Sequence, residues 1–173
     1  MEDILDTIVS RRSVKKYKEV VPTKEEIDKV IKAGMYAPSG KNKQSSIILA
    51  ITNKQVRDDL SRLLADFRGV EGDPFYGAPV VLAVLADNSI STHVYDGSVV
   101  MENMLLEAHS IGLGACWIHH AKEVFNSAYA KNLLNNLGIA GDYEGVGFCI
   151  LGYSGVELNT PIPRKDNFVY FVE

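Results

Sequence analysis

The chain has 173 residues, of which 46% are hydrophobic and 23% charged, and its formal net charge is −4. A chain of this size corresponds to a single domain that can bury a core without a disulfide or a metal, so the composition excludes a disordered protein. The net negative charge argues against a protein that attracts nucleic acid over its whole surface.

The sequence also lacks the patterns that mark a secreted, membrane or zinc-binding protein. The N-terminus has no basic segment followed by an apolar run, as a signal peptide would. The longest uninterrupted apolar run, residues 80–86, is far shorter than the roughly 20 residues that span a bilayer. Cys116 and Cys149 form neither a C-x-x-C pair nor a metal-ligand cluster. We therefore expect a reduced, cytoplasmic protein with no membrane partner, no nucleic-acid partner and no metal.

Apolar spacing predicts a mixture of helices and strands in the first half of the chain. Thr23 and Glu26 form a capping-box pattern at the start of one helix, which ends before Pro38. The expected elements are helices at 2–11 and from 23, a polar loop at 38–45, a strand at 47–51, a helix at 54–67, a loop at 68–77 and a strand at 80–86. The last strand is apolar throughout, so we expect both of its faces to be covered.

The second half contains the most apolar helix. The expected elements are a helix at 94–111 that stops at Gly112, a short strand at 113–118, a helix at 123–137 followed by Gly138, a strand at 146–153 and a tail at 155–173 that ends in a β-prone stretch, 168–172. A helix that is apolar nearly all round, as 94–111 is, lies at the centre of a fold or in a subunit interface. Helices and strands do not alternate strictly, so the pattern predicts an α+β fold in one domain that spans 1–173.

A cluster of five cations and one hydroxyl follows the first helix. The cations are Arg11, Arg12, Lys15, Lys16 and Lys18, and the hydroxyl is that of Ser13. On composition alone, a solvated charged face is the better interpretation. The alternative is an anion site, because paired guanidiniums and a hydroxyl supply donors that match a phosphate.

Two further stretches carry groups that could bind a ligand. Residues 37–44 offer hydroxyl, ammonium and amide groups on a loop, and the amides of Asn42 and Gln44 suit the edge of a heteroaromatic ring, although a polar turn is the simpler alternative. Residues 112–117 contain Gly-x-Gly, but these glycines close a helix, and Trp117 stands where a dinucleotide-binding motif needs a third glycine. Small residues there either let the backbone approach a flat ligand or simply end a helix before a core strand.

The histidines and cysteines do not form a convincing nucleophile or metal site. Cys116, His119 and His120 are close in sequence, but no separate Asp or Asn partner is evident, so Cys116 is better interpreted as a small core residue. His93 and His109 have no carboxylate or histidine at metal-ligand spacing, and we expect both to be structural or exposed.

The order of these motifs resembles the nitroreductase family over nearly the whole chain. Residues 11–15 look like its opening flavin-phosphate motif, 37–39 with Asn42 and Gln44 like its second motif, 75–81 like the lead into its central strand, 96–118 like its long dimer helix with the flavin-side end, and 151–153 with 161–165 like its C-terminal pattern. Five ordered motifs make the resemblance specific for the family, though not for a substrate.

The resemblance implies a mainly antiparallel sheet flanked by helices, in an intertwined homodimer with two FMN sites at the subunit interface. The C-terminal arm, about 155–173, would reach the partner subunit. Site residues follow by position. Arg11, Arg12 and Ser13 would hold the FMN phosphate together with Arg164 and Lys165, and Lys15 would lie near the pyrimidine edge. Pro38, Ser39, Lys41, Asn42 and Gln44 would line the ring or the ribityl chain, some from the partner, and the backbone of Gly114, Ala115, Trp117 and Ile118 would approach the ring.

The implied activity is that of an FMN-dependent oxidoreductase. NADH or NADPH would pass hydride to flavin N5 in a ping-pong scheme, and a small nitroaromatic, quinone or related acceptor would then be reduced. No catalytic side chain is needed, although Lys15 would stabilise reduced flavin. The alternatives are an FMN-binding protein without turnover, for storage or sensing, and a nucleic-acid-binding module that uses residues 11–18.

Two departures from the family pattern bear on the site. Ser45 and Ser46 stand where members often have Pro-Trp, so packing beneath the flavin is expected to differ. The chain is also of the short type, without the insertion that forms a helical lid, so a more open active site is expected.

Overall fold

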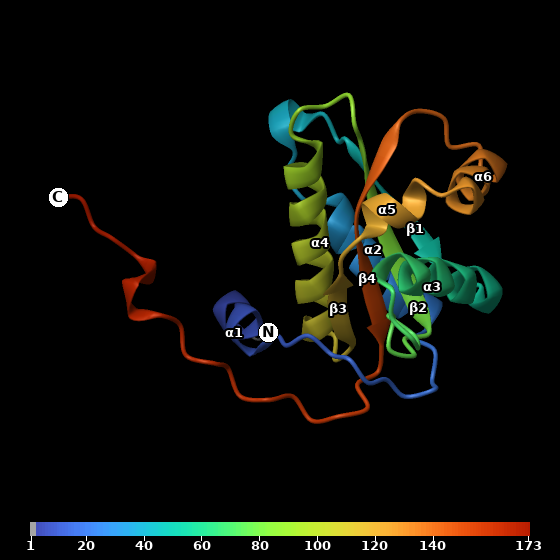
Figure 1. Ribbon diagram of the computed structural model, residues 1–173. Helices are drawn as coiled ribbons and strands as arrows, with labels where there is room; N and C mark the ends of the chain where they lie inside the picture. The colour runs from blue at the N-terminus through green and yellow to red at the C-terminus, as the bar shows by residue number, and fades with distance from the viewer. Residues whose placement is uncertain (1–2) are drawn as a thin grey trace.

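The computed structural model describes residues 3–173, which form a four-stranded sheet between two helical layers (Figure 1). The strands are β1 (Ser46–Ile51), β2 (Val80–Asp87), β3 (Gly114–Ile118) and β4 (Tyr143–Gly152). The helices are α1 (Ile4–Ser10), α2 (Lys24–Met35), α3 (Lys54–Arg68), α4 (His93–Ser110), α5 (Ala121–Phe125) and α6 (Ala128–Asn136), with 3-10 turns at Gly40–Asn42 and Asp166–Phe168. The expected α+β class is confirmed, and residue 2 of the first predicted helix lies outside the described residues.

The sheet is antiparallel throughout, with the order β1-β2-β4-β3. Strands β1 and β3 are therefore its two edges. Every residue from 80 to 86 is fully buried, which confirms that both faces of β2 are covered. Side chains alternate along β2, so Val81 and Leu85 face one core cluster while Leu82 and Val84 face the other.

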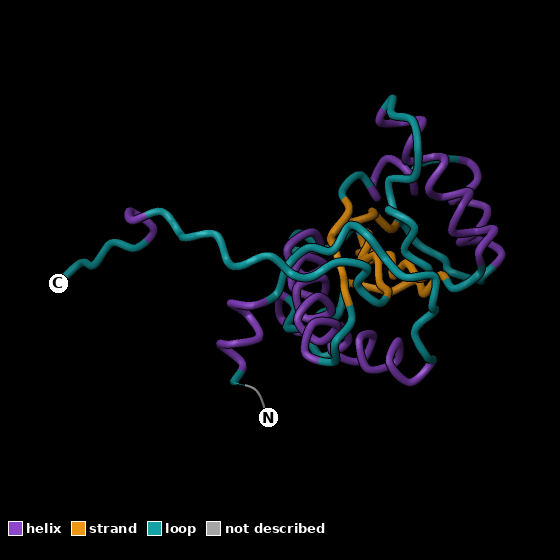
Figure 2. Tube along the Cα trace, turned by 90° about the horizontal axis from the view of Figure 1, so that it is seen from below, coloured by secondary structure: helices purple, strands orange, loops and turns teal. Residues whose placement is uncertain are grey.

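The helices divide between the two faces of the sheet (Figures 1 and 2). Helices α2 and α4 cover one face, and α3, α5 and α6 cover the other. The capping box expected at Thr23 and Glu26 is present at the start of α2. Helix α2 packs closely on α4 at Gly34, which has no side chain. A Cβ at this position would lie only 2.8 Å from Cγ of Met104. Helix α4, the most apolar helix in the sequence, is thus held between α2 and the sheet.

Helix α4 divides its large apolar residues between the core and the outer side. Val100, Met101, Met104 and Leu105 are buried, because the sheet and α2 enclose this side of the helix. Val99 is 38% exposed and Leu106 is half-buried. Val94 and Tyr95, near the start of the helix, are exposed as well. Part of the apolar surface of α4 is therefore not covered within the chain.

The helix predicted at 123–137 is two shorter helices, α5 and α6. Asn126 ends α5, and the Ser127 side chain accepts a hydrogen bond from the backbone N–H of Ala130, which begins α6. Serine is a strong N-cap because its side chain satisfies a backbone donor that the first helical turn leaves free. The break was missed because the apolar spacing continues across it. Gly138 follows α6 with φ 72°, as expected for a residue after a helix end.

The two terminal segments extend beyond this core. Helix α1 exposes the apolar side chains of Ile4, Leu5 and Ile8. The tail from Val156 onward is exposed and runs away from the body of the fold (Figures 1 and 2). Its β-prone end, 168–172, forms no strand in the single chain. Among the described residues, no helix is both long and apolar enough to cross a membrane.

Candidate functional site

The basic segment 11–15 lies in extended form along the edge strand β3. Ser13 pairs with Ala115 in a parallel bridge, and the backbone N–H of Val14 donates to the carbonyl of Ala115 at 3.0 Å. Val14 is buried, and a Cβ at Gly114 would lie 2.9 Å from Cγ2 of Val14. Gly114 thus lets the segment approach the strand closely. This docking fixes a row of cationic and hydroxyl side chains at the β3 edge.

Alternate side chains of the segment have different surroundings. Ser13 and Lys15, two residues apart in the extended chain, line one hollow beside the segment, whereas Arg11 and Arg12 line another. Within residues 3–173, the side chains of Arg11 and Ser13 make no hydrogen bond or ion pair, so their donors are available. Arg12 instead donates to the carbonyls of Val9 at 2.9 Å and Asn159 at 3.1 Å. Its Nη2 is buried without a partner.

Two hollows flank this segment. The first, the Arg11 hollow, has a volume of about 120 Å³, room for a few water-sized groups. It is lined by Arg11, Arg12, Val14, Leu105, His109, Gly112, Leu113, Gly114, Ala115, Ser154 and Leu158. Two guanidiniums beside a small hollow form a cradle suited to an anionic group.

The second, the Tyr76 hollow, has a volume of about 310 Å³. It is lined by Ser13, Lys15, Arg68, Tyr76, Cys116, Trp117, Ile118, His119 and His120. The ammonium of Lys15 lies 5.6 Å from the centre of the Tyr76 ring, within the range of a cation–π contact. Four predicted site residues, Ser13, Lys15, Trp117 and Ile118, therefore meet in one cavity with others that the sequence did not single out.

A hydrogen-bonded turn holds Tyr76 in the second hollow. The carboxylate of Asp73 accepts from the backbone N–H groups of Phe75 at 2.9 Å and Gly77 at 2.7 Å, and it pairs with Arg57. Burial alone would raise the pKa of Asp73, but these hydrogen bonds outweigh it and hold the pKa below its ordinary value. Tyr76 itself has φ 53°, a conformation that few side chains adopt without such support.

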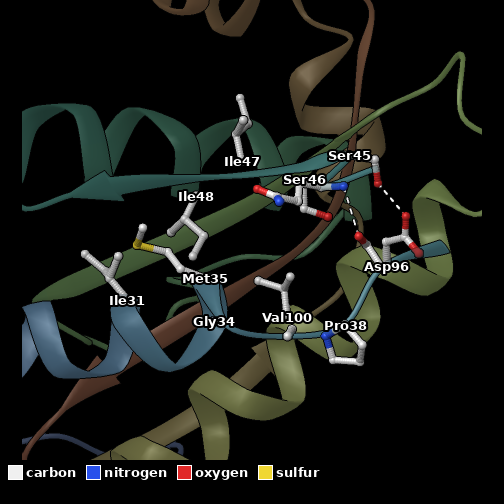
Figure 3. A pocket seen from close by; sticks show the side chains of 13 residues that line it. Ile31, Gly34, Met35, Pro38, Ser45, Ser46, Ile47, Ile48, Asp96 and Val100 are labelled. Atoms are coloured by element: carbon white, nitrogen blue, oxygen red, sulfur yellow. Dashed lines mark hydrogen bonds between the residues drawn. The ribbon is translucent and has the colours of Figure 1, made fainter. Parts of the chain in front are cut away.

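The loop at 38–45 is anchored by a buried carboxylate. Asp96, on α4, accepts from the hydroxyl of Ser45 at 2.7 Å (Figure 3). It also accepts from the backbone N–H of Gly40 at 2.9 Å and from the hydroxyl of Thr92 at 3.1 Å. Burial raises the pKa of Asp96, and the three donors more than reverse this, so the pKa lies below its ordinary value. In the sequence, Asp96 belongs to the helix motif at 96–118, and no local pattern predicts a role for it.

The same loop holds three residues in left-handed backbone conformations. Lys41, Asn42 and Gln44 have φ of 52°, 53° and 49°. The backbone N–H of Gln44 donates to Oγ of Ser39 at 2.9 Å, and its side chain donates to Asn42 at 3.3 Å. Such strain persists only where surrounding contacts enforce it, and it is common where a loop contacts a ligand. An adjacent cavity of about 400 Å³ is lined by Pro38, Ser39, Gln44 and residues of α2, α4 and β1.

The predicted site residues do not all meet within one chain. Segment 11–15 and residues 114–118 lie at the β3 edge, whereas the loop 38–45 leads into β1 at the opposite edge. Arg164 and Lys165 lie in the exposed tail, where Arg164 donates to the carbonyl of Ile162 and Lys165 lies near Phe168. A site that uses all of these groups requires more than one copy of the chain.

Sequence reasoning missed several residues around the Tyr76 hollow. Arg68 ends an ordinary amphipathic helix, and Tyr76 belongs to a loop, so spacing alone marked neither. His119 and His120 were considered only as partners of a thiol nucleophile. Cys116 is 4% exposed and packs in the core, as expected, and burial raises the pKa of Cys149 to about 12.

The chain matches the Nitroreductase family over residues 8–67 and 65–153. A protein of Methanothermobacter thermautotrophicus with the provisional name NADH dehydrogenase/NAD(P)H nitroreductase is 32% identical over 66% of this chain and 60% of its own length. The NADPH-flavin oxidoreductase of Vibrio harveyi is 29% identical over 68% of this chain and 54% of its own. The chain thus spans little more than half the length of these two relatives.

A solved structure matches the chain over its full length. It is a nitroreductase with bound FMN from Bacteroides fragilis, 25% identical, with a TM-score of 0.87 and coverage of 100% of both chains. The expected fold, with its antiparallel sheet flanked by helices, is thereby confirmed.

Proposed function

Because the chain belongs to the nitroreductase family, we propose that it is an FMN-dependent oxidoreductase that takes hydride from NADH or NADPH. The acceptor is a nitroaromatic, a quinone or a related small molecule. The Bacteroides structure of the same fold carries FMN, and the Vibrio relative is a flavin oxidoreductase that uses NADPH. These similarities support the cofactor and the donor.

The observation that carries the proposal is the docking of segment 11–15 on β3. The docking places Arg11 at one hollow and Ser13 and Lys15 at the other. The segment lies close to the backbone of β3 because Gly114 has no side chain. The free donors of Arg11 and Ser13 and the buried, unpartnered Nη2 of Arg12 fit a phosphate group. The donor set of this chain therefore fits FMN.

Bound FMN would supply the redox chemistry by accepting hydride at N5 and releasing two electrons to the acceptor. The protein binds the cofactor and orients it. Arg11 and Ser13 bind the phosphate, and the ammonium of Lys15 stabilises negative charge in the Tyr76 hollow by a few kcal/mol at an effective dielectric of about 20. Since flavin carries the reaction, no side-chain nucleophile is assigned.

We further propose that the working form is a homodimer. The loop 38–45 and segment 11–15 lie at opposite edges of the sheet, so a partner subunit must bring one to the other. The exposed apolar residues of α1 and of the tail supply surface for such an interface. Among residues 3–173, no strand lies beside the outer side of β1, so the partner's β-prone stretch 168–172 can pair there.

An absorption spectrum of the purified protein tests the cofactor. We expect about one FMN per chain and bleaching of the flavin band on addition of NADH or NADPH. A colourless protein that takes up no added FMN would contradict the proposal. Steady-state consumption of NADH or NADPH with a nitroaromatic or quinone then separates an enzyme from the second candidate, an FMN-binding protein without turnover.

A further inference from the structure

A cavity of about 400 Å³ lies beside β1, between α2 and α4 (Figure 3). Its walls are largely apolar, with Ile31 from α2, Ile48 from β1 and Val100 from α4. None of the described residues that line it is cationic, and its one carboxylate, that of Asp96, already accepts three hydrogen bonds. The cavity therefore differs from the two cationic hollows at the β3 edge, and it suits an uncharged group.

Ser46, the first residue of β1, gives this cavity an unsatisfied polar atom. Its Oγ is buried and, among residues 3–173, has no hydrogen-bond partner. Ser46 shares the α2–α4 side of the sheet with Ile48, because residues two apart in a strand point the same way. A buried hydroxyl without a partner is destabilising, so a group that enters the cavity gains by pairing with it.

The tail of a second copy of this chain supplies a side chain with both properties. In the stretch 168–172, Tyr170 is the only residue with a hydrogen-bonding side chain, and its ring is apolar. Within one chain the tail leads away from β1 and Tyr170 is exposed (Figures 1 and 2). In extended form, residues 156–173 span roughly 60 Å, about twice the width of a small domain, which is enough to reach across a partner.

Pairing of the stretch 168–172 with the outer edge of β1 brings Tyr170 to the cavity. Alternate side chains of a paired strand lie on the same side of the sheet, so Phe168 and Tyr170 share one side and Phe171 lies on the other. The unpartnered hydroxyl of Ser46 selects the side with Tyr170 for the α2–α4 face. The ring fits, because a cavity of about 150 Å³ already holds a benzene molecule.

We propose that Tyr170 of the partner subunit inserts into this cavity. Its ring packs against Ile48 and Val100, and its hydroxyl pairs with Oγ of Ser46. The inference rests on the homodimer of the proposed function and adds the residue that joins the tail to the loop 38–45, since Pro38 and Gln44 also line the cavity.

An exchange of side-chain size between the two positions tests this. Ser46→Trp should fill the cavity and exclude the ring, which should raise the Kd of the dimer about 100-fold, and Tyr170→Ala should have a similar effect. The two changes together should cost less than their sum, because the tryptophan then replaces the missing ring. Sedimentation over a range of protein concentrations measures the Kd. Phe171→Ala, on the other side of the strand, is the matched control and should not rescue Ser46→Trp.

A milder pair of changes tests the two hydroxyls and decides the question if Ser46→Trp fails to fold. Tyr170→Phe keeps the ring and should raise the Kd of the dimer about three- to tenfold, because one buried hydrogen bond is lost. In the Ser46→Ala chain, Tyr170→Phe should have no such effect, since the hydroxyl of Tyr170 has no partner there. The same loss in both chains would contradict the pairing of Tyr170 with Ser46.

Three further results would overturn the inference. They are an unchanged Kd of the dimer in Tyr170→Ala, a rescue of Ser46→Trp by Phe171→Ala that equals the rescue by Tyr170→Ala, and a parent protein that sediments as a folded monomer. Failure of the proposed FMN-dependent activity has a different signature, because the protein then takes up no FMN. The sedimentation measurements on the same flavin-free protein still decide where Tyr170 lies.

Discussion

The loop 38–45 and the tail 155–173 are both predicted to contact the same flavin, yet they are built in opposite ways. The loop has strained residues held by internal hydrogen bonds, with the buried carboxylate of Asp96 at the centre. The tail is exposed along most of its length and has few hydrogen bonds of its own. Because ordering each residue costs about 1–2 kcal/mol, so few contacts do not by themselves hold the tail in one form. The loop is thus held within one chain, whereas in the proposed homodimer the tail would be held by the partner subunit.

Removal of the tail should have the largest effect. A chain lacking residues 156–173 should lose the dimer and, with Arg164 gone, FMN, while the sheet and its two helical layers stay folded. Interfaces that hold obligate dimers bury about 2,000–5,000 Å², and the tail supplies much of the exposed apolar surface. Sedimentation and the flavin spectrum measure both losses. Two results would contradict the proposed role of the tail in the dimer. One is a truncated chain that remains dimeric and yellow. The other is a full-length chain that sediments as a folded monomer at micromolar concentration.

Asp96→Ala should have the next largest effect, and it acts on the loop alone. The change leaves the backbone N–H of Gly40 and the hydroxyl of Ser45 without their acceptor, which should cost roughly 3 kcal/mol of unfolding free energy. Urea denaturation measures this. Thr92→Val, which removes only the 3.1 Å contact, is the matched milder change. Equal stability of Asp96→Ala and the parent would show that the loop does not depend on this anchor.

Segment 11–15 lies between the two extremes, since its backbone is docked while some of its side chains are free. Arg11→Ala should weaken FMN binding about 10- to 100-fold and leave riboflavin binding unchanged, because the charged contact is to the phosphate. Arg12→Ala should also weaken FMN binding, in part because the hydrogen bond to Asn159 at the start of the tail is lost. Titration with both flavins measures this. Equal affinity of the parent protein for FMN and riboflavin would show that the phosphate is not the anchor.

Lys15→Ala should change the redox behaviour more than the flavin content. Loss of a cation in the Tyr76 hollow should lower the flavin midpoint potential, on the order of 30 mV, which corresponds to about 1.4 kcal/mol for a two-electron couple. Potentiometric titration measures the shift, and Lys16→Ala, a neighbouring lysine outside the hollow, is the control. The same midpoint in Lys15→Ala and the parent would count against the assignment.

Acid should weaken the Asp96 anchor of the loop 38–45. The pKa of Asp96 is lower in the folded protein than its ordinary value of 3.8, so its contribution to stability is present above about pH 4 and declines as pH falls through the lowered pKa. Asp96→Asn should therefore flatten the pH dependence of unfolding in this range. Identical acid profiles for the two proteins would indicate that Asp96 does not contribute.

The sequence predicted the elements well where a single signal dominates. The apolar run of β2 and the capping box of α2 are local patterns, and the structure confirms both. The break at Asn126 was missed because a cap at Ser127 interrupts a helix without interrupting its apolar spacing. The length of β4 was underestimated at its start, where Gly145 has low strand propensity but allows the backbone of Ala121 to approach within 2.4 Å of a Cβ placed there.

For the site, motif order names candidate segments, which stay predictions, and it does not show how the fold holds them. The role of Asp96 depends on a contact to Gly40, 56 positions away, and no local pattern contains it. The Tyr76 hollow likewise combines side chains from α3, a turn and the residues after β3, which meet only once the sheet has formed. The loop 38–45 and segment 11–15 lie at opposite edges of the sheet because of the strand order. The spacing of residues along the sequence does not predict that order.

The position of β1 at an edge of the sheet has a consequence for how the protein must be made. A newly folded subunit has an unpaired strand and, in the same chain, an apolar β-prone tail that can pair with such a strand. In the proposed homodimer, the folded partner and an incompletely folded neighbouring chain would both present these two elements. Dimer assembly would therefore compete with aggregation. The yield of refolded dimer should therefore be highest at an intermediate protein concentration. At low concentration, dimers form slowly and the edge of β1 stays exposed. At high concentration, subunits associate into open-ended polymers instead of closed dimers.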